Sequence, residues 1–265
     1  MQLVRRLVIG VALAYAALLA FLYFGQEKLI FLPTKLPASH VFKKPDVVEV
    51  QVPVPGATLT ALHFKQPKAR GLVFYLHGNA GNLETWLTST EFYHRNGFDL
   101  FMIDYRGYGR STGKIESQAQ LHADVRAAYD LIAPQYQGRP IAVLGRSLGT
   151  ALAAKLAGDV QPALTILVSP YSSMRDMARE QYPFVPLALL RYPLDTGEYL
   201  SRMRTRALLV HGEADELIPI VHSERLLKQA SGALTQLLRV PRAGHDNIHQ
   251  FEAYIEGLSA ALKRL

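Results

Sequence analysis

The sequence contains no cysteine among its 265 residues. That absence excludes disulfide bonds, thiolate metal sites and a cysteine nucleophile, and it leaves the redox compartment open. Internal repeats, low-complexity segments and a linker to a second domain are also missing. Hydrophobic residues make up 49% and charged residues 19% of the chain, which is typical of a folded globular protein.

A concentrated basic surface is missing too. The formal net charge is +7. Residues 1–28 hold three of the 29 basic and one of the 22 acidic residues, so the remainder carries 26 minus 21, or +5. The densest basic run is "RTR" at 204–206, and no basic stripe alternates with aromatic residues. We therefore expect no nucleic-acid partner.

The nine histidines form no complete metal-binding pattern. His249 follows His245 by four residues, a spacing that zinc sites on a helix use, but no third ligand follows nearby. His77 and His211 each precede a glycine at the end of an expected strand. We interpret both as residues that hydrogen-bond within turns. We expect neither a metal nor a cofactor.

A long apolar run opens the chain. Residues 7–24, "LVIGVALAYAALLAFLYF", carry no charge, and as a helix they would span ~27 Å, enough for the hydrocarbon core of a bilayer. A cleaved signal peptide has small residues at its cleavage site, whereas bulky residues occur here in "FLYFGQEKLIFLP". The pattern favours an uncleaved membrane anchor over residues 1–28, followed by one domain over 29–265.

Basic residues flank this run on both sides. Arg5, Arg6 and the terminal amine precede it, and Lys28 and Lys35 follow it. The positive-inside rule therefore favours a cytoplasmic N-terminus by a small margin. We expect a single-pass membrane protein whose domain lies on the extracytoplasmic, periplasmic side.

From residue 46 onward, strand and helix patterns alternate. The expected strands are 47–54, 58–64, 71–78, 98–105, 140–145, 163–169, 206–212 and 234–240. The expected helices are 83–95, 117–131, 147–156, 221–230 and 248–262. The first two strands alternate apolar and polar residues as a β pair, and the later strands are continuous apolar runs, as in buried parallel strands. This succession predicts an α/β fold with a mostly parallel eight-stranded sheet and helices on both faces.

Two pentapeptides satisfy G-x-S-x-G, the turn on which serine hydrolases present their nucleophile. In "GRSLG", Ser147 comes directly after a buried strand and directly before an alanine-rich helix. In "GRSTG", Ser111 follows a glycine-rich stretch, and no helix begins within one turn after it. A nucleophile elbow requires the strand-to-helix position, so we predict Ser147 as the nucleophile and a flexible loop over the sheet edge around Ser111.

A serine hydroxyl needs a base, and the imidazole that serves as base needs an acid to orient it. Asp215 in "LLVHGEADELIP" and His245 in "LLRVPRAGHDN" each follow an expected strand. Ser147, Asp215 and His245 therefore occur in the chain order of α/β-hydrolases. Competing acids lie close to Asp215 and His245 in sequence, namely Glu213, Glu216 and Asp246. Asp104 ends a strand, and we interpret it as the anchor of the Arg106 loop.

With these residues in place, the chain resembles the α/β-hydrolase superfamily over about residues 47–265. It is most similar to a membrane-anchored branch related to the bud-emergence hydrolases, which share the blocks "HGNAGN", "DYRGYGRSTG", "GRSLG", "HGEADELIP" and "GHDN". The resemblance implies Ser147 as nucleophile, Asp215 as acid and His245 as base. It also implies an oxyanion hole formed by the backbone N–H groups of Asn79 and Leu148.

The span 170–204 is longer than a simple crossover and contains "YPFVPLALLRYP" at 182–193. Two interpretations stay open. The span forms a small helical cap that lends apolar walls to an acyl pocket, or it packs one extra helix on the sheet.

We expect a serine hydrolase that cleaves esters or thioesters of small-molecule or lipid-like apolar acyl substrates through an acyl-enzyme. Two alternatives remain: a serine peptidase or aminopeptidase, and a non-catalytic membrane scaffold that keeps the fold. The sequence leaves the natural substrate and the oligomeric state open.

Overall fold

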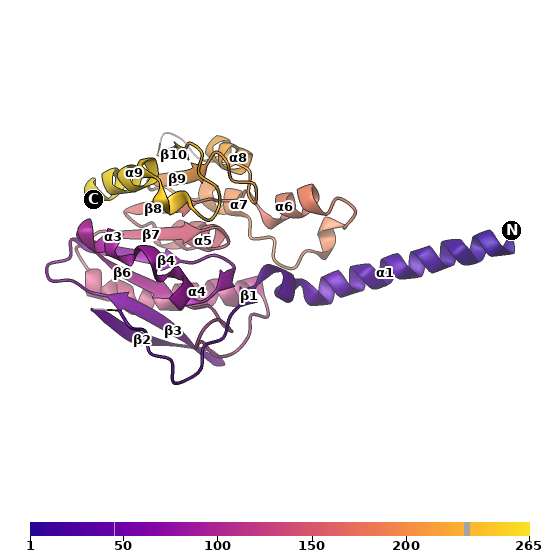
Figure 1. The fold of residues 1–265 in the computed structure, drawn as a ribbon, viewed down its shortest axis with the longest axis horizontal. Coiled ribbons are helices and arrows are strands. Elements are labelled where there is room, and N and C mark those ends of the chain that lie inside the picture. The colour runs from indigo at the N-terminus through magenta and orange to yellow at the C-terminus, as the bar shows by residue number, and fades with distance from the viewer. Residues whose placement is uncertain (45, 231–233) are drawn as a thin grey trace.

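The computed structural model describes residues 1–44, 46–230 and 234–265 and contains an eight-stranded sheet (Figure 1). The strand order is β10-β9-β8-β7-β4-β6-β3-β2. Among the described strands of this sheet, β2–β3 and β3–β6 pair antiparallel, and the other neighbours pair in parallel. The strands are β2 (Val47–Val54), β3 (Ala57–Phe64), β4 (Gly71–Leu76), β6 (Phe98–Ile103), β7 (Ile141–Arg146), β8 (Leu164–Val168), β9 (Ala207–Gly212) and β10 (Thr235–Val240). The predicted α/β-hydrolase architecture is confirmed.

Helices cover both faces of the sheet and create two apolar cores. One core contains side chains of α4 (Gln118–Ile132), α5 (Gly149–Val160), α7 (Thr196–Ser201) and α8 (Val221–Gln229). The other contains side chains of α2 (Leu83–Trp86), α3 (Thr90–Arg95) and α9 (Glu252–Lys263). In β4, Phe74 joins the first core, whereas Val73 and Tyr75 join the second. This alternation explains why the central strands are apolar throughout: each face of the pleat is buried.

Two predicted helices are interrupted, and there the sequence interpretation was wrong. The stretch 83–95 is divided by the 3₁₀ turn η1 (Leu87–Ser89), where hydroxyl residues with low helix propensity follow one another. The stretch 248–262 contains η4 (Ile248–Gln250) and then Phe251, whose backbone is extended at ψ 136°. Phe251 packs against the second core, so tertiary packing overrides the helical pattern at this residue.

The N-terminal run forms one helix, α1 (Gln2–Ile30), that projects away from the domain (Figure 1). By length and composition it is able to cross a membrane, and none of its most apolar window is buried. The helix continues beyond the apolar run to Ile30. It leads into β1 (Leu32–Pro33), which pairs in parallel with β5 (Ala80–Gly81). Strand β5 directly follows residues 77–79, the Asn79 loop, which comes after β4.

The span 170–204 divides into two parts. Its second half holds α7, which packs against α5 and α8 as one of the helices that cover the sheet. Its first half holds α6 (Met174–Gln181) and the 3₁₀ turn η3 (Leu187–Leu189), which lie beyond the sheet next to α1 (Figure 1). The remaining 3₁₀ turn, η2 (Ala133–Tyr136), follows α4.

Ser111 lies in a loop, but this loop is not an exposed flap over the sheet edge. The Ser111 side chain is buried, its Oγ donates to the carbonyl of Asp104 at 2.8 Å, and it accepts from the N–H of Thr60 at 2.8 Å. Both partners are backbone groups next to or within strands. The hydroxyl therefore completes the hydrogen bonding where β3 and β6 end their pairing, and the expectation of a flexible surface loop was wrong.

We predict that Ser111→Ala lowers the free energy of unfolding by about 1–3 kcal/mol, because it leaves the buried Thr60 N–H without a partner. Thermal unfolding of the detergent-solubilised chain measures this change. Lys114→Ala, an exposed position in the same segment, serves as the control and should leave the unfolding temperature unchanged. Loss of hydrolytic activity in Ser111→Ala without loss of stability would contradict a structural role.

Candidate active site

Ser147 occupies the tight turn between β7 and α5. Its φ is 52°, the left-handed region that side-chain-bearing residues rarely adopt. A Cβ on Gly145 would lie 2.3 Å from the carbonyl oxygen of Gly149, and a Cβ on Gly149 would lie 2.2 Å from that of Leu76. Only glycine fits at either position. The two glycines let the helix approach the strands closely enough for the turn to present the serine at the carboxyl end of β7.

The structure brings the three predicted catalytic residues together in one hydrogen-bonded series. The Nε2 of His245 lies 3.1 Å from the Oγ of Ser147, and its Nδ1 lies 2.8 Å from Oδ2 of Asp215. Asp215 follows β9, and His245 follows β10. With Asp215 accepting from Nδ1–H, Nε2 of a neutral imidazole is unprotonated and able to accept the serine proton.

The Asp215 carboxylate is buried and held by several donors. Its Oδ1 accepts from the N–H groups of Ile218 at 2.8 Å and Leu217 at 3.1 Å, while Oδ2 accepts from His245. Burial alone would raise the pKa of Asp215, but the hydrogen bonds from His245 and Ile218 outweigh it and lower the pKa below its usual value. Asp215 is therefore charged at neutral pH.

The other acids considered from sequence do not occupy this position. Glu213, Glu216 and Asp246 are exposed. Buried His211 supports the Asp215 loop instead: its Nε2 donates to the carbonyl of Ile218 at 2.7 Å, and its Nδ1 accepts from the Ser223 hydroxyl at 2.7 Å. Burial lowers the pKa of His211, which keeps the ring neutral. This is the turn-forming role that the sequence predicted.

His77 has a similar place in the Asn79 loop, where its Nδ1 donates to the carbonyl of Gly78 at 2.7 Å. Its Nε2 faces the buried Asp104 at 3.4 Å, and burial raises the pKa of that carboxyl. The side chain of Asp104 accepts from the N–H of Leu83 at 3.0 Å.

Asp104 contacts the loop that contains Arg106 through its backbone, because its carbonyl accepts from the hydroxyl of Ser111 at 2.8 Å. The Arg106 side chain has a different partner. The Arg106 guanidinium forms a two-bond ion pair with Asp124, at 2.5 and 2.9 Å. It also donates to the carbonyl of Pro55. Arg106 thereby ties the loop after β6 to α4, because Asp124 lies on that helix. The sequence offered no local signal for a partner 18 residues away.

Asn79 and Leu148, the residues predicted to form an oxyanion hole, both line the cavity that Ser147 lines. The carbonyl of Asn79 is fixed by the N–H of Leu32 at 2.9 Å and by the hydroxyl of Tyr108 at 2.6 Å. A Cβ on the preceding Gly78 would lie 2.8 Å from the Trp86 ring and 3.5 Å from the Cβ of Ser147. A glycine there lets the loop pass close to the serine.

Arg146, at the first variable position of "GRSLG", was not singled out from the sequence. Its guanidinium lies over the Trp86 ring at 5.2 Å and donates to the carbonyls of His245 at 3.0 Å and Asp246 at 3.2 Å. Trp86 in turn stacks on His77, which precedes Gly78. Arg146 therefore joins the His245 loop to the loop of the predicted oxyanion hole. The available sequence signal was its position directly before Ser147. At a tight turn the side chains of adjacent residues point in different directions, so the residue beside the nucleophile is able to contact the surrounding loops.

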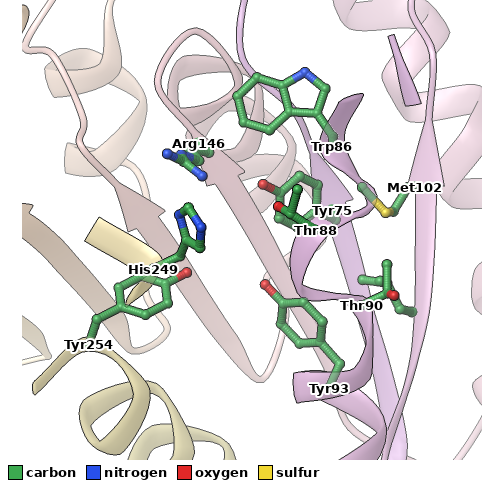
Figure 2. A pocket seen from close by; sticks show the side chains of 10 residues that line it. Tyr75, Trp86, Thr88, Thr90, Tyr93, Met102, Arg146, His249 and Tyr254 are labelled. Carbon is green, nitrogen blue, oxygen red and sulfur yellow. The ribbon is translucent and has the colours of Figure 1, made fainter. Parts of the chain in front are cut away.

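Figure 2 shows Arg146 on the rim of a small cavity that also contains His249 and three tyrosines, Tyr75, Tyr93 and Tyr254. The volume of about 20 Å³ is enough for one water and too small for a substrate. Burial lowers the pKa of His249 and keeps its ring neutral. Within the described ranges, no three His, Asp or Glu side chains gather as a metal site.

A second cavity, of about 390 Å³, extends from Ser147. This volume is within the range of ligand-binding pockets. Its walls come from the Asn79 and Leu148 loops, from α6 and the following segment, and from the last three turns of α1. Its described walls are mostly apolar, and the polar side chains among them are uncharged. Ser147 is among the residues that line this cavity.

We predict that Arg146→Met slows the reaction of Ser147 with a fluorophosphonate probe by on the order of 10²-fold, because the His245 loop loses its two hydrogen bonds and shifts. Arg146→Lys, which keeps a donor, should recover part of that rate. The labelling rate and the thermal unfolding temperature are measured together. An unchanged labelling rate in Arg146→Met would show that the His245 loop holds its position without Arg146.

Comparisons with known proteins place the chain among related sequences and folds. The family described as "Serine aminopeptidase, S33" matches residues 67–193. An uncharacterized protein of Mycobacterium tuberculosis is 32% identical over 249 residues, covering 89% of this chain and 86% of that protein. Alpha/beta hydrolase domain-containing protein 17B of Xenopus laevis is 30% identical, covering 72% of this chain and 66% of that protein. A solved Pyrococcus furiosus esterase has a TM-score of 0.71 at 18% identity, covering 89% of this chain and 97% of that chain. The chain belongs to the α/β-hydrolase superfamily, and this membership supports hydrolase activity.

Proposed function

We propose that this protein is a serine hydrolase that cleaves carboxylic esters or thioesters of apolar acyl groups through an acyl-enzyme. The observation that carries the proposal is the series Ser147, His245 and Asp215, linked at 3.1 and 2.8 Å, at the end of an apolar cavity. Nucleophile, base and orienting acid are each within hydrogen-bond reach of the next.

In the first half of the reaction, the Oγ of Ser147 attacks the acyl carbonyl while Nε2 of His245 takes its proton. The charged Asp215 stabilises the resulting imidazolium and keeps the ring in the required orientation. The carbonyl oxygen becomes an oxyanion, which the N–H groups of Leu148 and Asn79 stabilise. Removal of one such donor from a comparable site costs about 3 kcal/mol of transition-state stabilisation.

Collapse of the tetrahedral intermediate breaks the bond to the leaving oxygen or sulfur. His245 returns its proton to that atom, and an alcohol or thiol departs. In the second half, His245 takes a proton from water, whose oxygen attacks the acyl-enzyme carbonyl. The second collapse releases a carboxylic acid and restores the hydroxyl of Ser147, so the sum of the steps is hydrolysis.

An aminopeptidase is the second candidate, because the matching family carries that name. A free amino terminus is a cation, and a site that binds it gains from a carboxylate in its wall. The described walls of the large cavity are instead apolar or uncharged. This chemistry favours an acyl chain over a charged amino terminus. A non-catalytic scaffold has no use for the buried, hydrogen-bonded Asp215 and its histidine.

We further propose that α1 remains on the mature protein as a single-pass anchor, with the domain on the periplasmic side. The side chain of Gln26 is buried, and it hydrogen-bonds the carbonyl of Leu189 at 2.7 Å and the N–H of Arg191 at 2.8 Å. A cleaved segment would remove these contacts. Trypsin should digest the domain in intact spheroplasts, and full protection of the domain would reverse the proposed orientation.

The central test is labelling by a fluorophosphonate probe combined with hydrolysis of p-nitrophenyl esters and aminoacyl amides. Wild-type protein should be labelled, and Ser147→Ala should lose both labelling and turnover while it keeps its fold. Asp215→Asn should lower kcat by about 10⁴-fold, because it removes the charge that stabilises the imidazolium. Exposed Glu213→Gln is the matched control, expected to behave as wild type.

Three outcomes would contradict the ester-hydrolase proposal. An unlabelled wild type would remove the nucleophile, and equal labelling of Ser147→Ala would move it elsewhere. Turnover of aminoacyl amides in preference to esters would establish the aminopeptidase instead.

A further inference from the structure

The membrane-type helix α1 forms part of the wall of the large cavity. Leu22, Gln26 and Ile30 line it from α1, and Met174 and Met177 line it from α6. Ser147, Leu148 and Asn79 lie in the same cavity. A helix whose only role is to tether a domain has no reason to border the nucleophile, so the position of α1 requires a separate explanation.

Polar contacts fix this end of α1 to the domain. The buried Gln26 side chain donates from its amide nitrogen to the carbonyl of Leu189, and its amide oxygen accepts from the N–H of Arg191. The neighbouring Glu27 pairs with the Arg191 guanidinium at 2.7 Å and accepts from the Tyr192 hydroxyl at 2.8 Å. These contacts hold α1 in one orientation against the segment after α6, and they make the cavity wall a fixed one.

We use the name apolar tip for residues 182–190, "YPFVPLALL", which carry no charge. Its two aromatic side chains, Tyr182 and Phe184, are 52% and 54% exposed. Contiguous exposed apolar side chains of this kind mark a surface that binds a partner or a membrane. The neighbouring helix α1 indicates that the partner of this surface is a membrane, because its exposed side chains are apolar and its length is sufficient to cross a bilayer.

The tip extends along the part of α1 that would cross the bilayer. The hydroxyl of Tyr15 donates to the carbonyl of Phe184 at 2.6 Å. Tyr15 lies in the middle of the apolar run 7–24, nine residues before Phe24, or ~14 Å along the helix axis. When residues 7–24 span the hydrocarbon core, the tip is immersed in the leaflet next to the domain.

Part of the backbone of the tip is hydrogen-bonded within the protein. Lipid offers no hydrogen bonds, so exposed N–H and C=O groups in it must find partners within the protein. The N–H groups of Val185, Leu189 and Leu190 donate to carbonyls within the tip. The carbonyls of Phe184 and Leu189 accept from side chains of α1, and the two prolines of the tip have no N–H to satisfy.

We propose that α1, α6 and the apolar tip form a binding groove for one long acyl chain, open to the bilayer, so that the substrate is a lipid ester or thioester already resident in the membrane. This inference rests on the proposed function. The acyl chain leaves the leaflet between α1 and the tip, and its carbonyl reaches Ser147. Hydrolysis at that carbonyl then yields a fatty acid and the alcohol or thiol that carried it.

The first experiment narrows the groove in the full chain reconstituted in nanodiscs. Leu22→Trp and Met177→Trp each place a larger side chain in the cavity wall, one on α1 and one on α6. Leu13→Trp makes the same change at an exposed residue of α1. In both wall variants, kcat/KM for p-nitrophenyl dodecanoate should fall by about tenfold or more relative to kcat/KM for p-nitrophenyl acetate. Leu13→Trp should alter neither value.

The second experiment measures the depth of the tip. Phe184→Trp adds a tryptophan to a chain whose single tryptophan is Trp86, so the wild type supplies the background signal. Nanodiscs made from lipids brominated on their acyl chains should quench the added fluorescence. Absence of added quenching would overturn the placement of the tip in the bilayer.

The results distinguish failure of the acyl groove from failure of the proposed serine-hydrolase function. If Ser147 is labelled and both esters are hydrolysed, but the wall variants slow the two esters equally or neither of them, the acyl groove is refuted and the hydrolase stands. If wild-type Ser147 is not labelled, the proposed function fails and the groove fails with it.

Discussion

The rest of the site depends on one close backbone approach, that of α5 to β4 and β7 at Gly145 and Gly149. A single Cβ at either glycine would lie 2.2–2.3 Å from a carbonyl oxygen. That approach holds Ser147 in the left-handed region and directs it toward the carboxyl end of the sheet. Because strands β9 and β10 run parallel to β7, the loops that follow them reach the same edge with Asp215 and His245.

Precise placement of the imidazole needs more than the sheet. The Asp215 loop is supported from within by His211, and the His245 loop is held from outside by Arg146. Arg146 also lies over Trp86, whose ring packs on Gly78 beside the serine. One guanidinium therefore connects the loop of the base with the loop that is proposed to bind the oxyanion. Both loops are thus contacted by a residue outside the hydrogen-bonded series of Ser147, His245 and Asp215.

Local sequence signals were sufficient for the eight strands and for the residues that the structure brings together around Ser147. Each of these signals depends on a short run: buried apolar strands, a glycine-flanked serine, and acids or histidines just after a strand. The errors at Ser111 and Phe251 have another origin. The partners of Ser111 and Arg106 are distant in sequence, and Phe251 leaves its helical pattern to pack in the core. Periodicity carries no information about such contacts.

The same limit applies to α1, whose composition indicates a membrane helix and nothing about its neighbours. Its contacts follow from Gln26, a polar residue just after the apolar run, which is buried because backbone groups of Leu189 and Arg191 satisfy its amide. These hydrogen bonds hold an apolar segment of the domain against the helix, and both line the cavity that contains Ser147. If the helix spans the bilayer, the depth of the membrane fixes the position of the cavity mouth. The anchor then determines which acyl groups reach the serine, as well as where the protein resides.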